Sequence, residues 1–418
     1  MPRIGLVLIA VMFFWFVSNP SAYGAGFALV QQGTAAMAQG NAFVAEANDA
    51  SAIFYNPAGL NQLKRPQIYL GTIFNYPDRE FHGPDGQFAQ TNHRLFHAGT
   101  AYVAIPFTDR VAAGVGFFAP FGLGTPWPPE WTGRYLTTFS ELKTYNLNPV
   151  ISVKPIESLS VAMGFNVLWS SVKLKRKVQL PFPLPDAETT LDGDGTGYGY
   201  NLGVLYEPVT GLKLGVAYRS EISLRYKGQL KTTLPAFIPA VPDIPGSANL
   251  TFPPSVTAGI SFSRFKPFSF EFDATWTGWS TYDQLEIRLN RPTVVNGVLT
   301  DRVVVPKNWK DVWAFRFGAN YELKNGMKLR VGYIYDLNPV PDDTLDPQVP
   351  DADRHIFTVG GDLKIKQFTL GIAYNYLLFE SRNKNNNLTL NGVPLPVQAN
   401  GRYESQVHSL GLSMAYQF

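Results

Sequence analysis

The segment His408-Ser-Leu-Gly-Leu-Ser-Met-Ala-Tyr-Gln-Phe418, at the carboxyl end of the sequence, alternates strictly between two kinds of side chain. In an extended chain the leucine, methionine, tyrosine and phenylalanine side chains point one way, and the small or polar ones point the other. This is a β-strand with one apolar face. Outer-membrane barrels commonly close with a strand that ends on an aromatic residue, so the segment predicts a membrane β-barrel.

The same alternation recurs between residues 65 and 418, with Gly, Ala, Ser, Asn or Arg opposite aliphatic and aromatic side chains. Clear examples are the segments 159–167, 212–218, 256–262, 313–321 and 370–376. Such segments add up to about fourteen strands, an even number, as single-chain bacterial barrels have. We therefore predict an all-β fold, a transmembrane antiparallel β-barrel at residues 65–418 in the bacterial outer membrane.

The amino-terminal residues indicate export. Arg3 precedes an apolar run over residues 4–17, and small residues follow at Ala22 and Gly24, which predicts a signal peptide at residues 1–24. The run is shorter than the roughly 20 residues of a spanning helix. The sequence has no cysteine and a formal charge of +3, so disulfides and thiolate metal sites are excluded and nucleic acid is not implied.

Short and long connections alternate along the chain, which places tight turns in the periplasm and long loops outside the cell. Two long loops are apolar and rich in proline, at residues 180–185 and 234–245. Because proline stiffens a chain, these loops can keep apolar side chains exposed. We expect an outer ligand-capture site there, and packing of the loops on one another as a lid is the alternative. The capture residues would be Phe182, Leu184, Phe237 and Ile238.

Residues 25–64 break the strand pattern. The segment is rich in alanine, has no alternation, and carries turn residues at Asn56-Pro57 and Gly59. A flexible leader is one interpretation, but the apolar content is high for a disordered tail. We therefore expect the segment to pack in the barrel lumen.

An ordered set of motifs resembles the FadL-type transporters, outer-membrane channels for long-chain fatty acids and other hydrophobic molecules. The resemblance spans nearly the whole chain. It rests on Ala25-Gly26-Phe27, Asn56-Pro57-Ala58, Pro120-Phe-Gly-Leu-Gly124, Trp131-Thr-Gly-Arg-Tyr135, Tyr218-Arg-Ser-Glu221, Trp309-Lys-Asp311, Pro339-Val-Pro341 and Val349-Pro-Asp-Ala-Asp-Arg354.

The resemblance implies a barrel plugged by an amino-terminal hatch at residues 25–64, ligand capture by outer loops, a deeper pocket, and a wall opening at a kinked third strand. It assigns hatch roles to Asn56, Pro57 and Ala58, and makes Phe27 the aromatic residue that faces the pocket. Glycine and proline disrupt strand pairing, which places the opening within residues 114–122. The residues at this lateral opening would be Gly114, Gly116, Pro120, Phe121 and Gly122.

An acidic cargo would need a cation near its carboxylate. The candidate head-group residues are Lys173, Lys175, Lys307 and Lys310. For Lys173 and Lys175, a place at the barrel rim without ligand contact is the alternative. Ser171 stands where the family resemblance leads us to expect an arginine, so a neutral cargo such as a hydrocarbon stays open.

These features favour passive uptake of hydrophobic molecules. A structural or adhesin-like barrel without transport is the main alternative, and a hydrophilic porin or a hydrolase built around His355 are others. We expect no enzymatic activity, no cofactor, no metal site and no nucleic-acid partner. The expected partners are hydrophobic small molecules, outer-membrane lipid and the barrel-assembly machinery, which would recognise Phe418, and the chain is expected to be a monomer.

Overall fold

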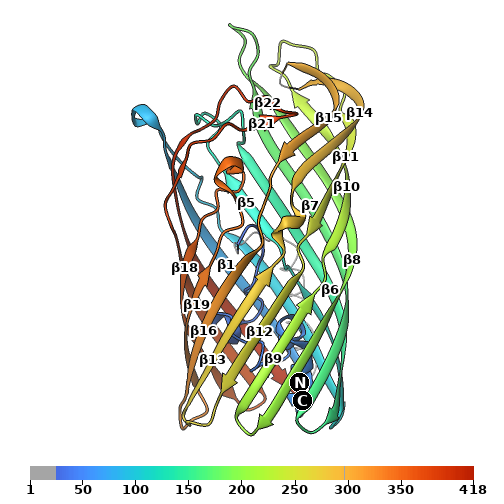
Figure 1. Cartoon of the computed structure of the whole chain (residues 1–418), viewed down its shortest axis with the longest axis vertical. Coiled ribbons are helices and arrows are strands. Elements are labelled where there is room, and N and C mark those ends of the chain that lie inside the picture. The colour runs from blue at the N-terminus through green and yellow to red at the C-terminus, as the bar shows by residue number, and fades with distance from the viewer. Residues whose placement is uncertain (1–24, 296) are drawn as a thin grey trace, which may run out of the picture.

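The chain forms a closed antiparallel barrel whose wall has fourteen strand positions (Figure 1). The computed structural model describes residues 25–295 and 297–418. The predicted signal peptide, residues 1–24, lies outside the described residues. No helix of the described part is long and apolar enough to cross a membrane. The fold confirms the predicted all-β barrel.

Several wall positions are built from two consecutive short strands, so the structure contains more strands than wall positions. The strands are β1 Gln67–His82, β2 Phe88–Gln90, β3 Phe96–Thr108, β4 Val111–Phe118, β5 Gly122–Pro126, β6 Phe139–Ile156, β7 Leu159–Val178, β8 Ala187–Val209, β9 Leu212–Arg219, β10 Ile222–Thr233, β11 Ile244–Phe252, β12 Ser255–Phe262, β13 Phe268–Thr277, β14 Gln284–Val295, β15 Val298–Pro306, β16 Val312–Glu322, β17 Lys328–Asp336, β18 Arg354–Ile365, β19 Phe368–Phe379, β20 Arg382–Lys384, β21 Thr389–Leu390, β22 Val393–Pro394 and β23 Gly401–Gln417.

The carboxyl-terminal strand closes the barrel. β23 pairs antiparallel with β19 on one side and with the whole of β1 on the other, from Gln67 opposite Gln417 to His82 opposite Arg402. Closure of this kind leaves no unpaired edge in the bilayer, where an unpaired backbone group is costly. The alternation at residues 408–418 follows from this closure: Leu410 and Leu412 are exposed on the outer face, and Ser409 is buried on the inner face.

The two ends of the barrel differ. Tight connections such as 109–110, 157–158 and 210–211 lie at one end, which we call the turn end, and long hairpins extend from the other, which we call the loop end (Figure 1). The alternation of short and long connections assigns residues 179–196 and 229–250 to outer loops, but β8, β10 and β11 keep pairing within these ranges. The outer loops are therefore shorter than the sequence suggests.

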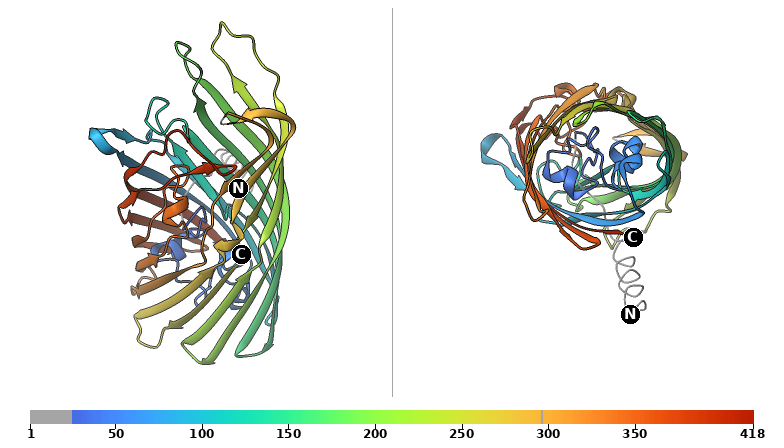
Figure 2. Two further views of the ribbon diagram at one scale, coloured as in Figure 1. Left: turned by 45° about the horizontal axis from the view of Figure 1, so that its top comes forward. Right: turned by 90° about the horizontal axis from the view of Figure 1, so that it is seen from below.

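Residues 25–64 lie inside the ring of strands, as the view along the barrel in Figure 2 shows. This segment contains few regular elements and is buried nearly throughout. The helices of the described chain are α2 Thr34–Ala38, α3 Ala52–Tyr55 and the 3₁₀ helices η1 Pro57–Gln62, η2 Pro84–Gly86, η3 Trp279–Thr281 and η4 Asp342–Thr344. We call residues 25–64 the plug.

Candidate functional site

Wall strands are interrupted where their residues surround the plug. The breaks lie between β4 and β5, β9 and β10, β11 and β12, β13 and β14, and β15 and β16. Residues at or next to these breaks surround Phe27, which is 3% exposed. The ring centroid of Phe27 lies 4.6 Å from Trp279, 5.4 Å from Trp309, 5.8 Å from Tyr282, 5.9 Å from Phe252 and 6.2 Å from Phe121. We call these five residues the aromatic cage.

The backbone before Phe27 is held against the loop between β17 and β18. The Gly26 N–H donates to Asp351 at 2.7 Å and the Ala25 N–H donates to Asp336 at 3.3 Å. Arg354 lies 3.2 Å from Asp336 and 3.6 Å from Asp351. Burial raises the pKa of Asp351, although the Arg354 charge opposes this. Gly26 has φ +63°, and a Cβ there would lie 2.5 Å from Trp309, so the position requires glycine.

The plug also completes the third wall position, where β4 ends and β5 begins. The Leu29 N–H donates to the Pro120 carbonyl at 2.8 Å, and the Gly122 N–H donates to the Phe27 carbonyl at 2.8 Å. Ala28 forms an isolated antiparallel bridge with Phe121. The plug thus supplies the backbone partners that the interrupted strand lacks. We call residues 119–121 the strand-three gap.

The gap has an apolar filling. On one side of the third wall position, β3 pairs with β4 and the last pair before the gap is Ala101 with Phe117. On the other side, β5 pairs with β6. Leu29 packs with Ala98 and Ala119 in a small buried cluster. Of the residues expected at the lateral opening, Pro120 and Phe121 lie in the gap, and Gly122 borders it as the first residue of β5. Gly114 and Gly116 do not lie at the gap, because β4 pairs with both β3 and β6 at these positions, and that part of the prediction is wrong.

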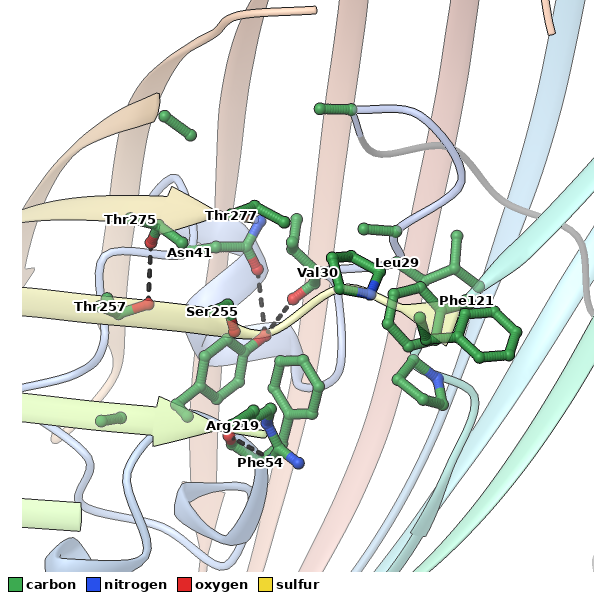
Figure 3. A pocket seen from close by; sticks show the side chains of 18 of the residues that line it. Leu29, Val30, Asn41, Phe54, Phe121, Arg219, Ser255, Thr257, Thr275 and Thr277 are labelled. Atoms are coloured by element: carbon green, nitrogen blue, oxygen red, sulfur yellow. Dashed lines mark hydrogen bonds between the residues drawn. The ribbon is translucent and has the colours of Figure 1, made fainter. Parts of the chain in front are cut away.

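A partly open cavity of about 130 Å³ lies between the plug and the wall next to the gap. Figure 3 shows side chains that line it. Leu29, Phe121 and Val312 are among its apolar lining residues, and Arg219 and Arg316 are its cations. Arg219 donates to the Phe54 carbonyl at 2.6 Å, and its guanidinium lies 4.5 Å from the Phe54 ring centroid. The cavity is thus apolar toward the gap and polar toward residues 33–64 of the plug, which we call the lower plug.

Comparison with known proteins agrees with this geometry. Residues 16–418 match the family described as outer membrane protein transport protein (OMPP1/FadL/TodX). The chain belongs to this family. Its members are transport proteins of the bacterial outer membrane, so the predicted location is confirmed.

Relatives of this FadL-type chain are distant in sequence. The chain is 25% identical to the 47 kDa outer membrane protein of Pasteurella multocida, with 95% of each chain covered. It is 25% identical to the long-chain fatty acid transport protein of Escherichia coli K12, over 82% of this chain and 85% of the relative.

Solved structures share the fold of the FadL-type chain. A Pseudomonas aeruginosa FadL homologue superposes with a TM-score of 0.79 at 21% identity, covering 94% of this chain and 100% of that one. The Pseudomonas putida toluene transporter TodX gives a TM-score of 0.72 at 17% identity, covering 96% and 99%.

The segment Asn56-Pro57-Ala58 fixes the lower plug to the wall. The Asn56 side chain donates to the Val44 carbonyl at 2.7 Å and to the Val204 carbonyl of β8 at 2.9 Å. It also accepts from the Ala58 N–H at 3.2 Å and caps η1, with Pro57 as its first residue. This motif is therefore an anchor on β8, and the residues that contact the strand-three gap are 27–32.

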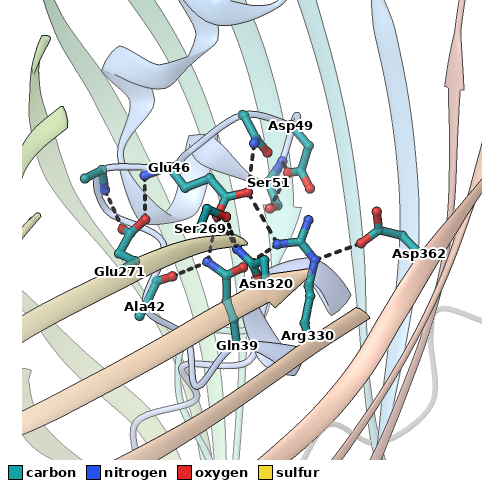
Figure 4. A network of polar contacts seen from close by, with 12 residues as sticks. Gln39, Ala42, Glu46, Asp49, Ser51, Ser269, Glu271, Asn320, Arg330 and Asp362 are labelled. Carbon is teal, nitrogen blue, oxygen red and sulfur yellow. Dashed lines mark hydrogen bonds and ion pairs between the residues drawn. The ribbon is translucent and has the colours of Figure 1, made fainter. Parts of the chain in front are cut away.

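A charged network holds the same part of the plug (Figure 4). Glu271 accepts from the Ala45 and Glu46 N–H groups at 2.7 and 2.8 Å. Arg330 lies 3.3 Å from Glu46 and 2.9 Å from Asp362. Hydrogen bonds to charged groups are worth about 1.5–3 kcal/mol each. The lower plug is therefore tightly bound to β13 and β17, and Asp362 of β18 holds Arg330 in place.

Glycines of the wall make room for this close contact. A Cβ at Gly215 would lie 2.2 Å from the Val44 carbonyl oxygen, and one at Gly332 would lie 2.2 Å from the Gly40 nitrogen. Side chains do not fit at such distances. The small residues that recur on the inner face of the strands thus form a seat for the plug.

The predicted head-group lysines are not in the cavity. Lys173 and Lys175 share the outward face of β7 with the exposed Phe165 and Trp169, because strand residues alternate between faces, so a lumen role for them is wrong. Lys310 is exposed outside the cavity lining.

Lys307 is buried, but it is neutralised by an ion pair with Asp346. Burial alone would lower its pKa, yet the Asp346 carboxylate holds the pKa of Lys307 above its usual value. The lysine charge is therefore already matched. The sequence analysis missed the two arginines that do line the cavity, Arg219 and Arg316, although both stand at inward positions of alternating segments.

The predicted capture residues lie on adjacent hairpins at the loop end. β8 pairs with β10, so the β7–β8 connection neighbours the β10–β11 connection. Phe182 is 98% exposed and Phe237 is 67% exposed, whereas Leu184 and Ile238 are partly buried. The next hairpin, β14–β15, adds the exposed Val294 and Leu299, which the sequence analysis did not single out.

One further cluster lies on the outer wall near the loop end. Glu80, His82 and Glu404 bring ligand-type atoms within 4.8 Å of one another. Glu80 and His82 already contact each other at 3.1 Å, and Glu404 pairs with Arg402 at 2.6 Å. We describe this group as a surface ion-pair cluster.

Proposed function

We propose that the protein is a passive outer-membrane channel for hydrophobic molecules, which leave the lumen sideways through the strand-three gap. The observation that carries this proposal is the position of the plug, whose residues 27–29 fill both the aromatic cage and the gap. Moving an alkyl chain into water costs about 0.8 kcal/mol per methylene. A plugged lumen with an apolar cage that opens toward lipid avoids this cost.

The proposed route starts at the hairpin tips and continues into the cavity. A cavity of about 130 Å³ is close in size to one that holds a benzene molecule, about 150 Å³. A longer chain therefore needs more space than the closed state provides. The cage would supply that space if Phe27 left it, since the cage is already shaped for an apolar group. Cargo would thus compete with Phe27.

We infer that residues 27–32 rearrange and that the lower plug stays in place. The upper segment is held to the gap by few backbone hydrogen bonds and the Gln32 side chain, which donates to the Ala119 carbonyl at 2.6 Å. The lower plug is held by Asn56, Glu271 and Arg330. The difference in bonding favours local release, which opens the wall next to Phe121 and keeps the axial path closed.

The surroundings follow from the fold. The outer face presents apolar side chains to lipid, and Phe418 lies at the turn end, where its N–H donates to the Pro66 carbonyl at 3.1 Å. We propose that the barrel-assembly machinery recognises this carboxyl-terminal aromatic residue and that the chain works as a monomer without catalysis. A purely adhesive barrel would have no use for a cavity gated by its own plug.

Replacing Phe182 and Phe237 together by serine should lower the initial uptake rate of a hydrophobic ligand about tenfold at low concentration. A buried Phe is worth about 1.5–3 kcal/mol, and partial contact with ligand at each ring would account for this loss. Uptake at saturating ligand should change little, because the later steps are intact. Uptake of a radiolabelled alkane by cells measures both regimes.

The matched control is Phe107→Ser, which removes a ring that is 65% exposed at the turn end. It should leave uptake unchanged. Equal uptake by the Phe182/Phe237 variant and the wild type at low ligand would remove the capture role of these hairpins.

A further inference from the structure

The polar end of the cavity contains two buried side chains of opposite charge on neighbouring strands. Asp273 on β13 stands directly opposite Arg316 on β16. Asp273 is 1% exposed and Arg316 is 6% exposed, and both line the cavity. Few charged groups are buried this far unless they are paired. Polar atoms of these two side chains that have no partner in the protein could therefore select which ligand binds in the cavity.

Each of the two side chains keeps bonding capacity that the protein does not use. One carboxylate oxygen of Asp273, Oδ2, accepts from the Phe43 and Val44 N–H groups at 2.8 and 3.1 Å. Its other oxygen has no hydrogen-bond partner within the described chain. The Arg316 guanidinium donates through Nη1 to the Thr275 hydroxyl, and its Nε is unpartnered among the described residues. A buried group left in this state costs free energy, which a ligand could recover.

The charges of the pair determine what kind of head group fits. Asp273 and Arg316 carry opposite charges, so the two side chains together have no net charge to attract an ion. A carboxylate head would approach Arg316 only beside Asp273, and Glu271 stands two residues along the same face of β13. Arg219, the other cation of the cavity, is occupied by the Ile53 and Phe54 carbonyls. A neutral group that both donates and accepts a hydrogen bond, such as a hydroxyl, can bond to the Asp273 carboxylate and to the Arg316 guanidinium at the same time.

We propose that Arg316 and Asp273 form a subsite for the hydroxyl head of a neutral amphiphile, such as an alkanol or an alkylphenol, with the apolar part lying toward the aromatic cage. The hydroxyl accepts from the Arg316 guanidinium and donates to Asp273. This inference rests on the proposed channel function and adds its ligand class.

The test is equilibrium binding of decanol, decanoate and decane to the purified full-length protein in lipid nanodiscs. Decanol should bind about tenfold more tightly than decane or decanoate, as expected for one hydrogen bond to a charged group. Arg316→Gln should remove most of this advantage. Asp273→Asn should reverse the order of decanol and decanoate, because the amide keeps an acceptor for the plug N–H groups and offers a donor to an anion.

Thr369→Val is the matched control, since it removes a threonine hydroxyl from β19, outside the cavity lining. It should leave the order unchanged, and the heat-dependent gel shift of each variant checks that the barrel is folded. Equal binding of the three probes, or a decanol preference that survives both charge substitutions, would overturn the subsite and leave the channel standing. Absence of binding by all three probes would overturn the channel proposal itself.

Discussion

Oxidation of the double variant Ala28→Cys/Phe121→Cys should reduce uptake of hydrophobic ligand to the level of cells that lack the protein. The two residues are antiparallel bridge partners, so their separation suits a disulfide. The chain has no other cysteine, which prevents competing pairs. The disulfide would tie the plug to the strand-three gap and keep Phe27 in its cage. Uptake of a radiolabelled alkane with and without a thiol reductant measures the effect.

Reduction should restore most of the uptake, and each single cysteine variant should respond to neither treatment. The barrel should keep its heat-dependent gel shift throughout, because the bond joins residues that already touch. Normal uptake by the fully oxidised double variant would mean that cargo passes without release of residues 27–29.

The second large effect is expected where the wall glycines receive the lower plug. The double variant Gly215→Val/Gly332→Val adds side chains that clash with the plug. The new Cβ atoms would each lie 2.2 Å from a plug backbone atom, of Val44 and of Gly40 respectively. Overpacking of about 3 kcal/mol would raise the population of the displaced plug about a hundredfold. Because the plug closes the barrel along its axis, displacement should open an aqueous path. Single-channel recording in planar bilayers detects it as frequent ion-conducting openings.

Ala113→Val serves as the control, since Ala113 shares the outward face of β4 with the exposed Val115. It should stay as silent as the wild type. A silent glycine double variant with a folded barrel would show that the seat is not needed to keep the lumen closed.

The barrel could be predicted because its main determinant is local. Alternation between adjacent residues decides which side chains face lipid, and the even strand count follows from closure. The terminal strand shows this well, since its pairing with β1 runs without a shift from Gln67 to His82. The lengths of the outer strands could not be predicted, because pairing beyond the bilayer depends on the neighbouring strand and not on an apolar pattern.

The site was only partly predictable, for a related reason. Glycine and proline marked the third strand as irregular, but the gap lies at residues 119–121 and spares Gly114 and Gly116. Those two glycines face inward and leave space for the side chain of the plug residue Ile53. Glycine at these positions therefore allows close packing of the plug and does not interrupt the strand. Likewise, a lysine near a strand end gives no indication of its partner, and the Lys307–Asp346 pair joins loops far apart in sequence.

Lateral exit can be tested by photolabelling intact cells with decanol that carries a diazirine at the end of its chain, followed by mass spectrometry of the labelled peptides. We predict adducts in the cage and at the strand-three gap, on Phe252, Pro120 and Phe121. We predict none on Gln62 at the end of the plug helix η1 or on its partner Lys213, which lies on β9 beside the tight connection 210–211. Adducts on Gln62 and Lys213 without labelling of the gap would contradict sideways release and establish passage along the barrel axis.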